Sequence, residues 1–104
     1  MIFTTTETIP NKNITEILGV ARGNTVRARA IGKDIMAGFK SIAGGEIHEY
    51  SNLMADSREE AFQRMAKKAE ELGADAVVNI RFTTSMITQG SAEILVAGTA
   101  VKIN

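Results

Sequence analysis

The sequence ELGADAVVNIRF, residues 71–82, marks the point where a long helix gives way to a sheet. On its N-terminal side, apolar residues recur at helical spacing from about Glu46 to Leu72, which is typical of an amphipathic helix. Gly73 supplies the residue type that most often ends a helix in a left-handed backbone conformation. The segment therefore predicts one long helix that is followed directly by a strand.

Two strands are predicted on the C-terminal side, over residues 76–87 and 93–103, with a turn near Gln89-Gly90. Both strands carry apolar side chains on both faces. In the second strand, one face is predicted to hold Ile94, Val96, Gly98 and Ala100. A domain in which helices cover one sheet face needs only one apolar face per strand, so the pattern leaves apolar surface for another partner.

A β-hairpin is predicted at residues 14–31, where two apolar runs flank Gly23-Asn24. A two-residue Gly-Asn link between such runs is typical of a type II′ turn. Pairing Arg22 with Thr25 would place Arg27 and Arg29 on one face and the small apolar residues on the other, the latter set being Ile17, Gly19, Ala21, Val26, Ala28 and Ala30.

The remaining segments are predicted to be a short strand at residues 2–6, a loop at residues 7–13 and a short helix after Asp34. Asp is a common N-cap, and Ile35, Phe39 and Ile42 then repeat at helical spacing. Gly44-Gly45 is predicted to end this short helix.

Helices and strands are thus segregated rather than alternating, which is typical of an α+β fold. We expect a single domain, residues 1–104, with two layers: an antiparallel-rich sheet, and one long and one short helix. Because several strands are apolar on both faces and the helices are few, we also expect the chain to associate with copies of itself.

Composition excludes several classes of function. The 104 residues contain 12 Lys and Arg and 12 Asp and Glu, so no net charge attracts the chain to nucleic acid or to an anionic membrane. The absence of cysteine excludes disulfides, thiolate nucleophiles and cysteine-ligated metal sites. The longest apolar run, Ile94 to Val101, is far shorter than the ~20 residues of a membrane span, and no signal-peptide pattern is present. A cytoplasmic location is expected, with neither nucleic acid nor a membrane as partner.

Several short motifs carry a family resemblance: Gly19-Val20, Gly23-Asn24-Thr25-Val26, Gly44-Gly45-Glu46 with Tyr50, Leu72 to Val78, and Gly98-Thr99-Ala100-Val101. In this order and spacing they resemble the YbjQ-like family of small bacterial and archaeal proteins over nearly the whole chain. The resemblance implies a dodecin-like subunit fold and a ring-shaped homopentamer. It also implies the family's label, heavy-metal binding, which assigns no chemistry.

A candidate metal site begins at His48, the single histidine. On a helix, His48, Asn52 and Asp56 share one stripe because they lie four residues apart. With Glu46 and Glu49 as further donors and with ligands from several subunits, this stripe is a candidate site for a divalent metal, the one cofactor that we consider. The alternative is an ordinary solvated or interfacial histidine.

A candidate ligand site comprises Arg27, Arg29 and Tyr50. Paired guanidinium groups on one strand face can bind a phosphate or a carboxylate in bidentate fashion. The alternative is an ion pair of these arginines with Glu16 or with an acidic residue of the next subunit.

Three functions remain open. The leading hypothesis is a non-enzymatic homo-oligomer that binds a small ligand or metal at subunit interfaces. The alternative is a structural scaffold that presents its ring to another protein and has no small-molecule site. The third is an enzyme with an interfacial site built from Arg27, Arg29, His48 and Tyr50, although no GxSxG elbow or phosphate-binding loop is present.

Overall fold

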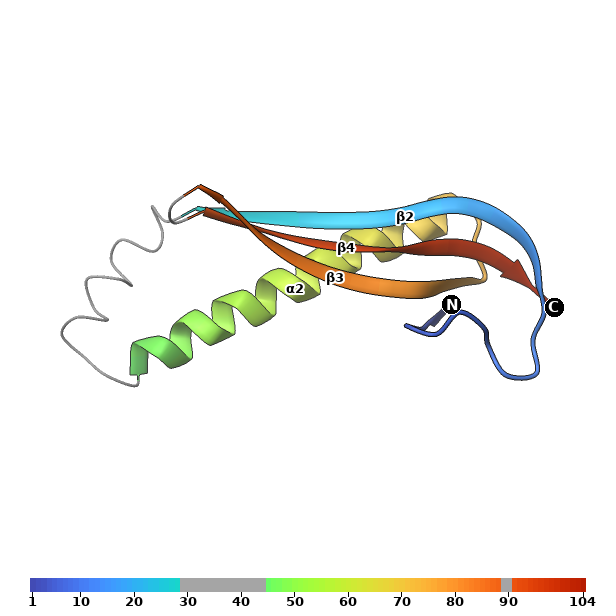
Figure 1. Cartoon of the computed structure of the whole chain (residues 1–104), viewed down its shortest axis with the longest axis horizontal. Helices are drawn as coiled ribbons and strands as arrows, with labels where there is room; N and C mark the ends of the chain where they lie inside the picture. The colour runs from blue at the N-terminus through green and yellow to red at the C-terminus, as the bar shows by residue number, and fades with distance from the viewer. Residues whose placement is uncertain (29–44, 89–90) are drawn as a thin grey trace.

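A computed structural model describes residues 1–28, 45–88 and 91–104 (Figure 1). In this part of the chain one helix lies along a sheet of four strands, which confirms the α+β class. The elements are β1 (Ile2–Phe3), β2 (Ile14–Ala28), α2 (Gly45–Glu71), β3 (Ala76–Thr88) and β4 (Ser91–Ile103). The predicted short helix, Arg29 and the Gln89-Gly90 turn lie outside the described residues.

The sheet has the strand order β1-β3-β4-β2. β4 is antiparallel to both β2 and β3, and the short β1 is parallel to β3. β2 and β3 therefore run in the same direction on either side of β4. The predicted strands at residues 76–87 and 93–103 are confirmed to within two residues, as is the antiparallel-rich sheet.

The long helix is confirmed as α2, and it ends as Gly73 predicts. Gly73 adopts φ 78°, its N–H donates to the carbonyl of Glu70, and the N–H of Ala74 donates to the carbonyl of Ala69. This pair of bonds is the Schellman motif, which satisfies carbonyls left open at the end of a helix. No helix within the described ranges has an apolar stretch long enough to cross a membrane.

The predicted hairpin at residues 14–31 is wrong, because β2 runs without a turn from Ile14 to Ala28 along β4. Gly23 lies in mid-strand opposite Val96, beneath α2. A Cβ built on Gly23 would lie 2.2 Å from the carbonyl oxygen of Ala61, so glycine serves here to admit the helix rather than to turn the chain.

The faces of β2 are consequently reassigned. Ala21, Gly23, Thr25 and Arg27 alternate along the side that faces α2, whereas Val26 lies on the opposite side, away from Ala21. The hairpin would have placed Ala21 and Val26 on one face, since a turn at Gly23-Asn24 reverses the alternation of side chains.

The core lies between α2 and the sheet. From α2, Ser57, Ala61, Met65 and Ala69 form a buried stripe at four-residue spacing. It packs on a buried set from the strands, namely Ala21, Val77, Ile80, Ile94, Val96 and Ala100. The predicted apolar face of β4 is therefore buried. A smaller cluster on the opposite sheet face consists of Ala76, Val78 and Val101, with Ile9 and Ile103 packed against it.

The N-terminal segment covers only part of the β3 edge. Thr4 donates its N–H to the carbonyl of Val77 and accepts from the N–H of Ile80, while Thr6 accepts from the N–H of Asn79. Asn79 has φ 59° and lies at a β-bulge. The predicted strand at residues 2–6 is thus shorter, Ile2–Phe3, and the edge of β3 beyond Arg81 has no strand beside it within the described residues.

Candidate functional site

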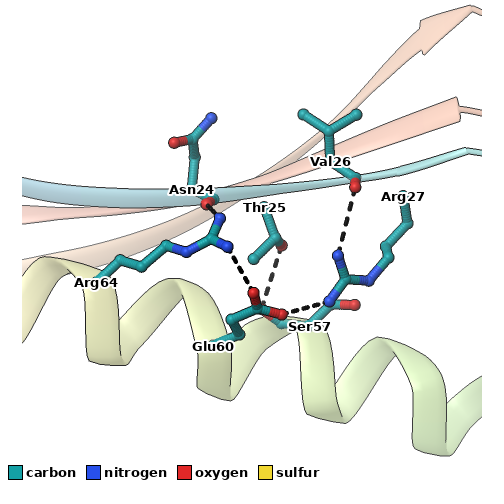
Figure 2. Close-up of polar contacts among 7 residues, drawn as sticks. All are labelled: Asn24, Thr25, Val26, Arg27, Ser57, Glu60 and Arg64. Atoms are coloured by element: carbon teal, nitrogen blue, oxygen red, sulfur yellow. Dashed lines mark hydrogen bonds and ion pairs between the residues drawn. The ribbon is translucent and has the colours of Figure 1, made fainter.

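A three-residue ionic cluster joins α2 to β2 (Figure 2). The Glu60 carboxylate accepts from Arg27 Nη2 through one oxygen and from Arg64 Nη2, at 2.6 Å, through the other. The remaining Nη1 groups donate to the backbone of β2. Arg64 bonds the carbonyl of Asn24 at 2.6 Å, and Arg27 bonds that of Val26 at 3.4 Å. The cluster therefore ties one flank of the helix to the edge strand.

The two guanidinium groups hold Glu60 ionised. The hydrogen bond from Arg27, followed by the charges of Arg64 and Arg27, lowers the pKa of the Glu60 carboxyl. The partner of Arg27 is thus Glu60, not Glu16, and Arg27 faces the helix. Arg29 lies outside the described residues, so the predicted Arg27–Arg29 pair stays a prediction.

A buried polar contact lies beside this cluster. The Thr25 hydroxyl donates to the carbonyl of Ser57 at 3.2 Å, and both residues are fully or almost fully buried between β2 and α2 (Figure 2). Because a buried hydroxyl without a partner is costly, this bond helps fix the height of the helix above the strand.

The predicted metal and ligand residues on the helix are only partly placed. His48, Glu49, Tyr50 and Asn52 lie in the first half of α2, where the side chains fall outside the described part of the structure. Asp56 lies two turns beyond His48 and is exposed. Among the described residues, no three His, Asp or Glu side chains gather in a way that could hold a metal ion.

An apolar groove runs along the other flank of α2, beside β3. Phe62 of α2 stacks on Phe82 of β3, with ring centroids 6.5 Å apart and planes 8° apart. Phe62 also meets Phe3 edge-on at 5.0 Å. A pocket of about 430 Å³ lies here, lined by Ala55, Arg58, Glu59, Phe62 and Phe82. A second hollow of about 570 Å³ continues toward the N-terminus beside Met1, Phe3 and Ala66.

The groove is open because α2 packs mainly on β2 and β4 and leaves the second half of β3 uncovered. Phe82 and Met86 pair with Val96 and Ala92 of β4, so they point to the helix side of the sheet. They nevertheless remain 49% and 76% exposed. Sequence reasoning missed this groove, although the apolar residues on both faces of β3 were its signal.

Comparison with known proteins identifies the relatives of this chain. A family model described as "Putative heavy-metal-binding", YbjQ_1, matches residues 1–104. A UPF0145 protein of Archaeoglobus fulgidus is 59% identical over 103 residues, covering 99% of this chain and 95% of the relative. A UPF0145 protein of Colwellia psychrerythraea is 61% identical over 103 residues, covering 99% and 98%.

A solved structure shares the fold. It is a protein of unknown function from Pediococcus pentosaceus, described as a member of the DUF74 family, with a TM-score of 0.66 at 20% sequence identity. The match covers 100% of this chain and 98% of that one. The full-length family match and the high identity to these relatives together show that the chain belongs to the YbjQ family.

Proposed function

We propose that this chain is the protomer of a closed homo-oligomer, a pentameric ring, which binds a small ligand or a divalent metal between its subunits and catalyses no reaction. The observation that carries the proposal is the exposure of Phe82 and Met86 on the side of the sheet where the core lies. Large apolar side chains in core positions without cover are typical of a subunit interface.

The overall dimensions support self-association. The accessible surface is 6726 Å², whereas a compact monomer of 11.2 kDa exposes about 5,700 Å². The radius of gyration is 17.2 Å, against about 13 Å for a compact domain of this length.

The pocket beside Phe62 supports ligand binding. Its volume of about 430 Å³ lies within the range of small-molecule sites, which are mostly apolar with a few polar groups. Phe62 and Phe82 supply the apolar surface, and Arg58 and Glu59 supply charge at the rim. A ligand with an apolar body and an ionised group fits this lining.

Metal binding is the second form of the same proposal. The family description names heavy metals, and His48, Glu49, Asn52 and Asp56 are the residues of this chain that could donate to a divalent ion. A ring of five subunits brings five copies of His48 into one assembly, which supplies the donors that one chain lacks. The alternative function is a scaffold, in which the ring presents its surface to another protein and holds no small molecule.

Native mass spectrometry of untagged protein, purified without chelator in the expected cytoplasmic fraction, tests the proposal. We expect a five-subunit mass with additional mass in integral steps, and metal analysis or small-molecule mass spectrometry then identifies what is bound. A five-subunit mass with nothing attached, and no thermal shift across a metal and metabolite panel, would favour the scaffold. A monomer at all concentrations would contradict self-association itself.

Two substitutions distinguish the metal from the ligand. His48→Ala should abolish bound metal and leave the subunit number unchanged, with Gln63→Ala on the exposed side of the same helix as the control. Arg58→Ala should instead weaken binding of an anionic ligand in the pocket beside Phe62. Equal metal content in His48→Ala and in the unaltered protein would exclude the histidine as a ligand.

A further inference from the structure

Two phenylalanine rings lie parallel in the wall of the pocket beside Phe62. Phe62 belongs to α2 and Phe82 to β3, and their planes differ by only 8°. Stacked rings usually have centroids ~4.5–7 Å apart, and the 6.5 Å between these two is near the upper end of that range. The two rings therefore do not overlap closely, and Phe82 stays 49% exposed. Both rings keep aromatic surface free for a third planar group.

A third phenylalanine holds the ring of Phe62 in place. Phe3 meets Phe62 edge-on, with centroids 5.0 Å apart and planes at 65°. Phe3 lines the neighbouring hollow and not the pocket itself, so this contact leaves the pocket side of Phe62 open. The aromatic surface is thus in position before a ligand arrives, which lowers the entropy cost of binding.

The two charged groups at the rim of the pocket differ in what they already bind. The Glu59 carboxylate accepts a hydrogen bond from Gln63 Nε2 at 2.8 Å. Arg58 makes no hydrogen bond or ion pair in the described part of the chain, whereas Arg27 and Arg64 are both ion-paired. The unused donors of Arg58 fit a group with anionic oxygens, which a guanidinium binds in bidentate fashion.

Helix geometry places the arginine and the ring of Phe62 on the same flank of α2. Arg58 lies four residues before Phe62, and Ala55 lies three residues before Arg58, so all three side chains line the pocket. Apart from Arg58 and Glu59, the lining side chains are apolar. The body of a ligand is therefore bound through apolar and aromatic contacts, and its charged group is bound at one end.

The charge at the rim favours a carboxylate over a phosphate. Arg58 supplies one positive charge, and Glu59 supplies one negative charge beside it. A carboxylate carries a single negative charge, and its two oxygens match the planar fork of a guanidinium. A phosphate monoester carries a charge of about −1.5 to −2 near pH 7, so Glu59 would repel it more strongly.

Resting on the ligand binding proposed above, we propose that the ligand of this pocket is a planar aromatic carboxylate. Its ring system stacks on Phe62 and Phe82, and its carboxylate bonds the guanidinium of Arg58. A saturated molecule of the same size would fill the pocket but lose the stacking. A neutral aromatic molecule would stack but leave Arg58 without a partner. Planarity and one negative charge are thus both required.

Four matched probes test the proposal, each titrated into the full chain by isothermal titration calorimetry. The compound 2-naphthoate has both planar rings and a carboxylate. Naphthalenemethanol lacks the charge, decahydronaphthoate lacks the planar rings, and naphthyl phosphate carries the other anionic group. We expect the dissociation constant of naphthoate to be at least about threefold lower than that of any of the other three probes.

Substitutions locate the binding. Arg58→Ala should weaken naphthoate binding about tenfold and leave the affinity for naphthalenemethanol unchanged, because only the carboxylate contacts the arginine. Phe82→Leu keeps an apolar side chain but removes one ring, so it should bring the affinities for naphthoate and decahydronaphthoate closer together. Arg22→Ala removes another exposed arginine and should leave every affinity unchanged. Circular dichroism and native mass spectrometry check the fold and the subunit number of each variant.

Equal affinity of Arg58→Ala and of the unaltered chain for naphthoate would overturn the proposal. Equal affinities of the unaltered chain for the planar and the saturated carboxylate would also overturn it, whatever Phe82→Leu does to the assembly. If naphthoate does not bind to a ring that carries other bound mass in native spectra, this inference fails and the function proposed above stands. A monomer that binds naphthoate through Arg58 would instead contradict the ring alone.

Discussion

Gly23 of β2 lies directly against the backbone of Ala61 in α2, so closely that no other residue fits between them. A Cβ at Gly23 would lie 2.2 Å from the carbonyl oxygen of Ala61 and 2.4 Å from the backbone nitrogen of Met65. These contacts involve backbone atoms, which cannot swing aside as a side chain can. The helix therefore owes its position on the sheet to the missing side chain at Gly23.

Gly23→Ala should lower the free energy of unfolding by about 1–3 kcal/mol or more, because the helix must move away from the strand to admit the methyl group. This range is the usual cost of overpacking a core. Chemical denaturation at fixed protein concentration measures the change in unfolding free energy. The control is Arg22→Ala, the neighbouring exposed residue, which should change it by less than about 0.5 kcal/mol. Equal effects of the two substitutions would contradict the close approach.

Gly73→Ala should cost about 1–2 kcal/mol because alanine disfavours the left-handed conformation at φ 78°. Nothing lies within 4 Å of a Cβ at this position, so the cost comes from the backbone alone. Gly73→Asn is the matched variant and should cost less, since asparagine tolerates this conformation. Thermal unfolding of both variants checks the order, and a larger loss for asparagine would be inconsistent with this explanation.

The Glu60 cluster should make stability depend on acid pH. The pKa of Glu60 is lowered in the folded state, so its stabilisation is present above the ordinary carboxyl pKa and is lost as the pH falls through the folded value. Between pH 5 and pH 3, the melting temperature of Glu60→Gln should therefore fall by less than that of the unaltered protein. Glu59→Gln, whose carboxylate accepts from Gln63 in the same helix, is the control and should follow the unaltered protein.

Met86→Glu should weaken self-association and leave the fold of the subunit intact. The side chain is 76% exposed in the single chain, so a charge there meets water until a neighbour covers it. We expect the dissociation constant to rise at least tenfold, equivalent to about 1.4 kcal/mol. Sedimentation over a concentration series measures it. Lys12→Glu, which also adds negative charge at an exposed position before β2, should leave the constant within threefold of its original value.

Local sequence signals predicted the elements whose partners lie near in sequence. The helix to Leu72, its end at Gly73 and the two strands after it follow from periodicity and from the conformational freedom of one glycine. The same signals failed at Gly23. The dipeptide Gly-Asn looks the same in the sequence whether the glycine forms a turn or lies in a strand beneath a closely packed helix. Which of the two applies depends on residues almost 40 positions away.

The candidate site divides in the same way. The sequence placed Arg27 on one strand face and offered Glu16 or an acidic residue of another subunit as its counter-charge. Glu60 and Arg64 lie four residues apart on α2, a spacing at which opposite charges pair. It did not reveal that Arg27 and Glu60 meet, because β2 and α2 are far apart along the chain. It also missed the groove between Phe62 and Phe82, because only the packing of α2 on the sheet brings these two rings together.

By itself, the sequence determined the α+β class, the long helix with its glycine end, the apolar face of β4 and the family, because these depend on residue order over short distances. Only the tertiary structure decided that β2 is a single strand, that Arg27 bonds Glu60, and that α2 packs mainly on β2 and β4 and leaves Phe82 and Met86 of β3 exposed. These features depend on how close two distant backbones come, and that distance is set by packing rather than by local pattern.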